Sequence, residues 1–390
     1  MRGKRKWSVA ILILLASLCL SVPMRAANVT VGCTGGSGGT YPSITAALNA
    51  IGQTGPHTIT VTGTCAESVA LFNARSILIT APTAGGATIV GLQDSNTFNI
   101  GLSQHITLQN LEIRGNSASS LGLGVNIFTN SQVNILTCNI HDTPKGGVSA
   151  NGGSAVALNN TTLQNSSNGD GLALGNSIAD MVSTTIQNNA GDGIFVSHSS
   201  ISIRQQNTIQ NNAGGWGIYA LDGSEVEIVT TAPALFTTIQ GHGQDGIVVG
   251  DQTMLRMQGG PHAIQGNGSA CPADPTCGGI YAIRNSTLRT TSGNISGNQG
   301  SGITVEQLAS FGLANTTISN NTASGVLIRR ISVGQFISGN TVTGNGGASV
   351  TCDTTSEVVG DLSTFSNIDC SRIERPLGPP RPGDTMHSNP

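Results

Sequence analysis

Apolar and polar residues alternate along this chain in a two-part motif that returns about every 23 residues. The first half-motif has the form T-I-x-N-N and occurs, with substitutions, eight times between residues 161 and 345. The second half-motif has the form G-I-x-V and follows the first seven times, from residues 169–174 to residues 323–328. The apolar residues of the first half-motif lie 23, 23, 30, 25, 31, 23 and 24 residues apart, and they are Leu163, Ile186, Ile209, Ile239, Ile264, Ile295, Ile318 and Val342.

The spacing within each half-motif predicts short strands. In G-I-x-V the two apolar residues are two positions apart, so both point to the same side of an extended segment. Strands of three or four residues gain stability when successive coils stack, because the backbones then pair and the apolar side chains form a continuous column. The repeat therefore predicts an all-β fold, a right-handed parallel β-helix solenoid.

A turn position in the repeat predicts a ladder of side chains inside the solenoid. The residue three positions after the apolar residue of T-I-x-N-N is asparagine in six of eight coils. Stacked at one turn, these amides are expected to bond to one another and to the turn backbone. The eight residues are Ser166, Asn189, Asn212, His242, Asn267, Asn298, Asn321 and Asn345.

The two ends of the chain have different patterns. Residues 43–51 place Ile44, Ala47, Leu48 and Ile51 at helical spacing behind Ser43, which predicts a short helix that covers the open end of the apolar column. Residues 1–27 combine a basic start with an apolar stretch over 9–20, as in a secretory signal peptide. We expect a β-helix domain over residues 28–372 and a proline-rich disordered tail over 373–390.

Charge and cysteine content bear on the class of binding partner and on the cellular compartment. Loss of residues 1–27 removes five of the 17 basic residues and leaves 12 against 20 acidic ones, a formal charge of −8. No basic patch remains to neutralise phosphates, which argues against a nucleic-acid partner. Export permits disulfides, and the economical pairs join Cys33 with Cys65, Cys271 with Cys277, and Cys352 with Cys370. Cys138 is then expected to be a small buried core residue.

The repeats match the PbH1 type of parallel β-helix repeat, and residues 30–370 resemble the pectin-lyase-like superfamily. The opening segment TYPSITAALNAI, residues 40–51, is similar to the entry of many such proteins, where a capping helix precedes the first coil. The resemblance implies the fold and a carbohydrate-related role. It does not select a reaction, because this scaffold hosts lyases, hydrolases, esterases, epimerases and non-catalytic binding proteins.

Two motifs that suggest chemistry have a structural explanation in the repeat. The G-H-G of residues 241–243 is found in polygalacturonase-like enzymes, but His242 occupies the ladder position and the other motifs of those enzymes are missing. Asp170, Asp192 and Asp245 fall where other coils carry Trp216 or small residues, which indicates a tolerant turn position. We interpret these four residues as structural.

One column of polar residues fits a functional site better. Five positions after the glycine of G-I-x-V, four successive coils carry His198, Asp222, Asp251 and Arg284. The outward position between the two apolar residues carries Phe195, Tyr219 and Tyr281 on the same face. Aromatic rings beside carboxylates and an arginine suit a sugar-binding groove. Long insertions at 230–236 and 266–277 are expected to wall this groove.

We therefore predict a secreted, monomeric protein that binds extracellular polysaccharide, with uronic acid polymers favoured, and whose capacity to cleave the polymer is left open. If it is an enzyme, a polysaccharide lyase or glycoside hydrolase, His198, Asp222, Asp251 and Arg284 are the candidate catalytic residues. Asp222 and Asp251 are also candidate Ca²⁺ ligands. Phe195, Tyr219 and Tyr281 are the candidate sugar-binding residues. The alternative is a non-catalytic surface or extracellular module that binds glycans or partners.

Overall fold

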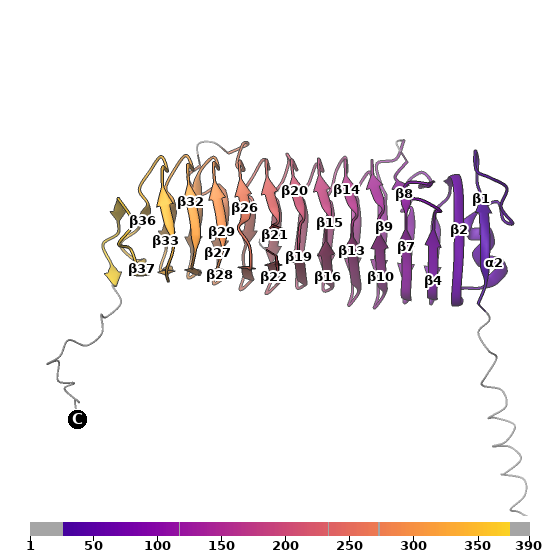
Figure 1. Cartoon of the computed structure of the whole chain (residues 1–390), viewed down its shortest axis with the longest axis horizontal. Helices are drawn as coiled ribbons and strands as arrows, with labels where there is room; N and C mark the ends of the chain where they lie inside the picture. The colour runs from indigo at the N-terminus through magenta and orange to yellow at the C-terminus, as the bar shows by residue number, and fades with distance from the viewer. Residues whose placement is uncertain (1–25, 117, 233, 272–273, 375–390) are drawn as a thin grey trace, which may run out of the picture.

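The computed structural model describes residues 26–374, apart from 117, 233 and 272–273. Over this range the chain winds into an elongated β-helix whose coils stack along one axis (Figure 1). Strands of neighbouring coils pair in parallel. One of the two sheets has 13 strands, one from each coil, so the solenoid has about 13 turns. This confirms the predicted all-β parallel solenoid. Residues 1–25 of the predicted signal peptide and residues 375–390 of the predicted tail lie outside the described residues.

Each coil contributes to three faces, and the two faces of the 26-stranded sheet are joined through the long strand β2. Face 1 consists of β1 (Asn28–Gly32), the first part of β2 (Thr54–Ala66), β4 (Arg75–Thr80), β7 (Gln104–Gln109), β10 (Gln132–Leu136), β13 (Ala155–Asn159), β16 (Ile178–Val182), β19 (Ser200–Arg204), β22 (Glu225–Val229), β25 (Met254–Gln258), β28 (Thr287–Thr290), β31 (Ser310–Leu313), β34 (Val333–Phe336), β37 (Glu357–Gly360) and β39 (Ile373–Glu374). Face 2 consists of the end of β2 together with β5 (Ala87–Val90), β8 (Leu111–Arg114), β11 (Asn139–His141), β14 (Thr162–Gln164), β17 (Thr185–Gln187), β20 (Thr208–Gln210), β23 (Thr238–Gln240), β26 (His262–Gln265), β29 (Gly293–Ser296), β32 (Thr316–Ser319) and β35 (Thr341–Thr343).

Face 3 is the separate 13-stranded sheet, and it carries the G-I-x-V half-motifs. Its strands are β3 (Val69–Phe72), β6 (Phe98–Gly101), β9 (Leu123–Phe128), β12 (Gly146–Asn151), β15 (Leu172–Gly175), β18 (Ile194–Ser197), β21 (Ile218–Leu221), β24 (Ile247–Val249), β27 (Gly278–Ile283), β30 (Ser301–Glu306), β33 (Val326–Arg329), β36 (Val350–Cys352) and β38 (Ile368–Asp369).

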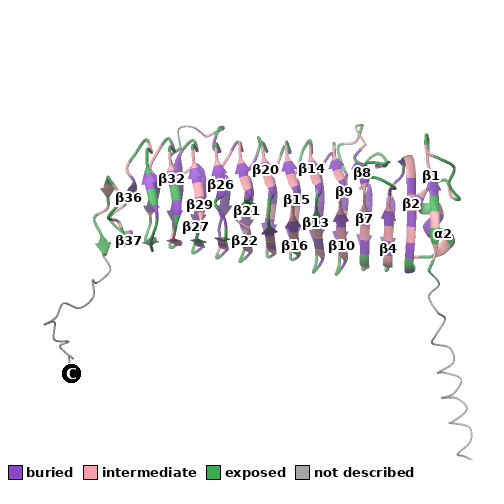
Figure 2. Ribbon diagram, viewed as in Figure 1, coloured by how far each residue is buried: buried purple, intermediate pink, exposed green. Residues whose placement is uncertain are grey.

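The core is a column of aliphatic side chains that runs the length of the solenoid. Ile186, Ile209 and Ile239 stack on successive coils of face 2 and are at most 1% exposed. In many strands, such as β18 and β21, buried and partly exposed positions alternate, and Figure 2 shows both classes on every part of the solenoid. Truncation of one such buried aliphatic side chain to alanine costs about 2–5 kcal/mol. Because exposing these side chains would lose comparable stability, the apolar side of each strand faces inward.

The predicted ladder is present at the turn between face 2 and face 3. Each rung from Asn189 to Asn345 accepts a hydrogen bond from the backbone N–H of the preceding rung, and Ser166 is the first donor. His242 is fully buried as one of these rungs, with Nδ1 accepting from the Asn212 N–H at 3.3 Å and Nε2 donating to the Ile209 carbonyl at 3.1 Å. Burial lowers the pKa of His242 to about 4, so the ring is neutral, as a structural rung requires.

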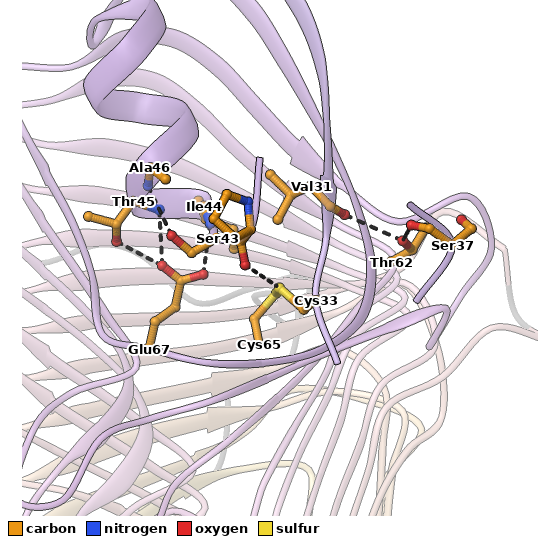
Figure 3. Close-up of a disulfide and its surroundings, with 11 residues drawn as sticks. Val31, Cys33, Ser37, Ser43, Ile44, Thr45, Ala46, Thr62, Cys65 and Glu67 are labelled. Atoms are coloured by element: carbon orange, nitrogen blue, oxygen red, sulfur yellow. Dashed lines mark hydrogen bonds between the residues drawn. A yellow bond between two sulfur atoms is a disulfide. The ribbon is translucent and has the colours of Figure 1, made fainter. Parts of the chain in front are cut away.

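The N-terminal end is closed by helix α2, Ile44–Ile51, as predicted (Figure 3). The Ser43 hydroxyl accepts from the Ala46 N–H at 3.0 Å, which is the expected N-cap. Glu67 adds a second cap, because its carboxylate accepts from the backbone N–H groups of Ile44 and Thr45 at 2.8 and 2.9 Å. The sequence did not indicate this contact, which joins the helix to the first coil.

All three expected disulfides are formed in the structure. They join Cys33 with Cys65 beside the capping helix (Figure 3), Cys271 with Cys277 in one loop, and Cys352 with Cys370 at the last coils. Cys138 is a free, buried cysteine. Within the described part of the chain, no helix is long and apolar enough to cross a membrane.

Candidate functional site

The outer side of face 3 carries a row of aromatic residues over β18, β21 and β27. Strand register places Phe195 beside Tyr219, Tyr219 beside Val248, and Val248 beside Tyr281. The rings of Phe195 and Tyr219 are 5.9 Å apart and tilted by 55°. The predicted alignment of the three aromatic residues is therefore correct, although Val248 separates Tyr281 from the other two.

Trp216 extends this row and was not assigned a functional role from the sequence. It precedes β21, and its indole stacks on Tyr219 with ring centroids 4.3 Å apart and an interplanar angle of 28°. The signal in the sequence is the segment GWGIYA, where an aromatic residue replaces the aspartate of neighbouring coils. We call the surface made by Phe195, Trp216, Tyr219 and Tyr281 the aromatic face.

The polar column lies at the C-terminal ends of the same strands, where face 3 turns into face 1. His198, Asp222, Asp251 and Arg284 have φ angles between 48° and 60°, in the left-handed region. Asparagine and aspartate tolerate this conformation better than most side chains, so backbone geometry accounts for part of the residue choice. Arginine has no such preference, and Arg284 therefore requires another explanation.

Arg284 is explained by its partner Asp251 on the preceding coil. Nη2 donates to Asp251 Oδ2 at 2.7 Å and Nε donates to Oδ1, so the pair is bidentate. This hydrogen bond lowers the pKa of Asp251 and raises the pKa of Arg284. Tyr219 and Tyr281 are near enough to the guanidinium to affect its pKa as well. Arg284 directly follows β27, three residues after Tyr281, so the ion pair lies at the C-terminal edge of the strands that carry the aromatic face.

His198 and Asp222 form a looser pair one coil further toward the N-terminus. His198 Nδ1 is 3.8 Å from Asp222 Oδ2, and the side chains are 69% and 41% exposed. Ser197 links them, because its hydroxyl lies 3.1 Å from Nδ1 and donates to Asp222 at 2.7 Å. All four residues of the column therefore lie on one exposed edge, in two successive pairs.

A ladder of hydroxyl groups holds this edge, and the sequence analysis missed it. The backbone N–H of Ser177 donates to the Ser199 hydroxyl, Ser199 to Ser224, and Ser224 to Thr253, at 3.0–3.3 Å. The signal was a serine or threonine one or two residues after each column residue. Because these bonds repeat from coil to coil, they fix the spacing of the charged side chains beside them.

The aspartates of the turn before face 3 have the structural role inferred from the sequence. Asp170, Asp192 and Asp245 each accept a hydrogen bond from a backbone N–H of the next coil, at 2.8, 2.9 and 2.6 Å. Burial raises the pKa of Asp170, and it raises the pKa of Asp192 and of Asp245 to about 7. Asp192 and Asp245 therefore do not carry full negative charges near neutral pH.

The two long insertions lie at different corners of the solenoid. Residues 266–277 connect β26 on face 2 to β27 on face 3, so they border the aromatic face. Residues 230–236 connect β22 on face 1 to β23 on face 2, and Phe236 lines a hollow on face 2. Only one of the two predicted groove walls is therefore beside the aromatic face.

The candidate calcium ligands Asp222 and Asp251 each face a basic side chain, His198 and Arg284 respectively. The one group of three potential metal ligands found among the described residues is Cys33, Cys65 and Glu67. Both sulfur atoms belong to a disulfide and Glu67 caps the helix, so this group has a structural role. At the column, a guanidinium occupies the position where a cation would meet Asp251.

Fold and surface together define a parallel β-helix protein with an aromatic outer face. The family described as the right handed beta helix region matches residues 69–232 and 273–374. The chain belongs to this family. No curated protein matches it in sequence.

Two similar solved structures share the fold at 13% sequence identity. The A-module of the Azotobacter vinelandii mannuronan C-5 epimerase AlgE6 has a TM-score of 0.59, with 86% of this chain and 93% of that chain covered. The periplasmic alginate epimerase AlgG has a TM-score of 0.54, with 83% of this chain and 77% of that chain covered.

Proposed function

We propose that this protein is an exported polysaccharide-binding protein whose glycan lies along the aromatic face. The observation that carries the proposal is that the Trp216–Tyr219 stack and the bidentate Asp251–Arg284 pair belong to neighbouring coils of face 3, with the ion pair at the C-terminal edge of the strands. Stacked rings bind the apolar faces of sugars, and fixed polar groups orient the hydroxyls. The three disulfides and the signal-like residues 1–27 support export.

Uronic acid polymers are the favoured ligands. Arg284 uses Nε and Nη2 for Asp251, which leaves the donors of Nη1 for a sugar carboxylate. The similar structures of alginate-epimerising proteins support the same ligand class. The formal charge of −8 after signal removal provides no general attraction for polyanions, so recognition depends on this one arginine and the rings.

The test is binding of defined oligouronates, measured by titration calorimetry, to the chain without residues 1–27. Oligomannuronate, oligoguluronate and oligogalacturonate hexamers are the probes. Tyr219→Ala and Arg284→Gln are expected to weaken the best hexamer at least tenfold. Arg204→Gln is the matched control, because Arg204 forms the same bidentate pair with Asp180 on face 1 and is 51% exposed against 44% for Arg284. If the Arg204 and Arg284 variants lost equal affinity for the hexamer, the proposal would be contradicted.

Cleavage of the bound polymer is a second candidate function, favoured by the His198–Asp222 pair. The two side chains are exposed and close enough to exchange a proton through Ser197 or water. Arg284 is protonated in its ion pair, and its raised pKa makes it a binding group and not a base. Asp251 positions Arg284.

Cleavage is tested by incubating the same polymers, with and without Ca²⁺, and recording ultraviolet absorbance and reducing ends. A lyase gives unsaturated products that absorb, and a hydrolase gives reducing ends alone. Either activity should be lost in Asp222→Asn and His198→Gln while oligosaccharide binding remains. Binding with no products from any polymer favours the alternative, a non-catalytic extracellular module.

A further inference from the structure

Face 2 carries a second surface that differs in chemistry from the aromatic face. Outward glutamines stack on five successive coils, and the side-chain amide of each donates to the amide oxygen of the preceding one at 2.8–3.0 Å. The ladder comprises Gln164, Gln187, Gln210, Gln240 and Gln265. We call it the glutamine ladder.

A hollow of about 590 Å³ lies along one side of this ladder, over β20, β23, β26 and β29. Its floor consists of Gln210, Gln240 and Gln265 with Thr208 and Thr238. Phe236 and Pro261 line it as well, and Phe236 is 38% exposed. Phe236 comes from the insertion 230–236, so the coil that departs from the 23-residue period supplies the aromatic residue.

A second hollow of about 470 Å³ lies at the other end of the same amides. Three successive coils have glycine at its corner, Gly241, Gly266 and Gly297, where the flanking coils have Asn211 and Asn320. The missing side chains leave Gln240 and Gln265 accessible from both sides. Every residue that lines either hollow is uncharged.

We propose that the three rungs of the glutamine ladder that line these hollows, Gln210, Gln240 and Gln265, form a binding site for a neutral, extended glycan that runs along the helix axis. A ladder amide uses one N–H and one lone pair for its neighbours, so it keeps one donor and one acceptor for a ligand. These free groups recur at the coil spacing of about 4.8 Å. A neutral sugar chain presents hydroxyls at regular intervals, and each hydroxyl can both donate and accept a hydrogen bond. Phe236 offers a ring face on which one sugar can stack.

The absence of charge in the lining selects this ligand class over a uronate. A carboxylate placed in either hollow would lose hydration without gaining a cationic partner among the lining residues. The site is therefore independent of the aromatic face, which has charged side chains along its edge.

The experiment is calorimetric titration of the chain without residues 1–27 with neutral hexasaccharides, namely cellohexaose, xylohexaose and mannohexaose, and with hexamannuronate for comparison. At least one neutral hexasaccharide should bind, and Phe236→Ala and Gln240→Ala should each weaken it at least tenfold. Gln187→Ala is the matched control, because Gln187 is an interior rung of the same ladder that lines neither hollow. The Gln187→Ala variant should bind the hexasaccharide as tightly as the unmodified chain.

Three outcomes overturn the inference: no neutral hexasaccharide binds, Phe236→Ala and Gln240→Ala bind as tightly as the unmodified chain, or Gln187→Ala loses as much as Gln240→Ala. Phe236 is exposed, so its variant keeps the test valid if removal of a ladder rung impairs folding. Tyr219→Ala separates this site from the aromatic face. Loss of oligouronate binding with retained hexasaccharide binding in that variant identifies two sites, whereas loss of both ligands overturns the second site.

Discussion

Replacing His242 with asparagine is expected to stabilise the protein, because the histidine rung leaves a buried amide unpaired. Where asparagine follows asparagine, one Oδ1 accepts both the backbone N–H and the side-chain Nδ2 of the preceding rung, as Asn321 does for Asn298 at 3.1 and 2.9 Å. His242 offers only Nδ1, which the Asn212 backbone N–H occupies. Among the described residues, Asn212 Nδ2 is buried without a partner.

The expected gain has a constant part and a part that depends on pH. Pairing one buried polar group contributes about 1–3 kcal/mol. His242 has its pKa lowered from 6.5 to about 4 by burial. Above pH 6.5 the ring is neutral in both the folded and the unfolded chain, so its titration does not affect the free energy of unfolding. As the pH falls from 6.5 to 4, the unfolded chain takes up a proton that the folded chain excludes, so stability is lost by about 3 kcal/mol. His242→Asn removes that loss.

The assay is urea unfolding of both proteins, followed by circular dichroism at pH 7.5 and pH 4.5. His242→Asn should be more stable by about 1–3 kcal/mol at pH 7.5 and by roughly 2–3 kcal/mol more at pH 4.5. Other titrating groups are common to both proteins and cancel in the difference. No gain at pH 7.5 would refute the unpaired amide, and a difference independent of pH would refute the buried neutral ring.

Three further predictions concern other buried groups. Burial raises the pKa of Asp245 from 3.8 to about 7, so stability is lost as the pH rises from 3.8 to 7, where the unfolded carboxyl ionises and the folded one stays protonated. Asp245→Asn should be more stable than the unmodified protein by roughly 4 kcal/mol at pH 8.5 and equally stable at pH 3.5, and thermal unfolding at both pH values checks this. Burial raises the pKa of the Cys138 thiol to about 11, so a thiol reagent at pH 8 should label it only in denaturant; rapid labelling of the native protein would contradict its burial. Glu67→Ala removes the acceptor for the backbone N–H groups of Ile44 and Thr45, which costs about 3 kcal/mol of local stability. Amide hydrogen exchange in Ile44–Ile51 should therefore become faster, whereas unchanged exchange would show that Ser43 caps the helix alone.

Most of the fold was predictable because a β-helix repeats one local rule. Alternation of apolar residues in G-I-x-V specifies the inward side of each strand, and recurrence of asparagine at one turn specifies the ladder. The same rule predicted that Phe195 and Tyr219 share a face and that His242 is a structural rung. The pairing of Cys33 with Cys65, predicted as the economical choice near the N-terminal end, is formed in the structure.

Specific contacts between outward side chains were harder to predict. Spacing placed Asp251 and Arg284 in one column, but not their bidentate pairing. Trp216 looked like a substitution at a turn, and only its stacking on Tyr219 gives it a role. The insertion 230–236 was expected beside the aromatic face, but it lies at the corner leading to face 2, because the strand before it belongs to face 1.

The sequence by itself determined the solenoid, the inward and outward positions of its strands and the position of the asparagine ladder, since these depend on period and on local backbone conformation. The tertiary structure decided which outward residues meet. Side-chain rotamers and the corner occupied by each insertion bring Trp216 to Tyr219, Arg284 to Asp251, and Phe236 to the glutamine ladder. The Arg284–Asp251 pair spans 33 residues between neighbouring coils, and the Trp216–Tyr219 stack lies within one coil but depends on the orientation of both rings. The proposed binding depends on these contacts.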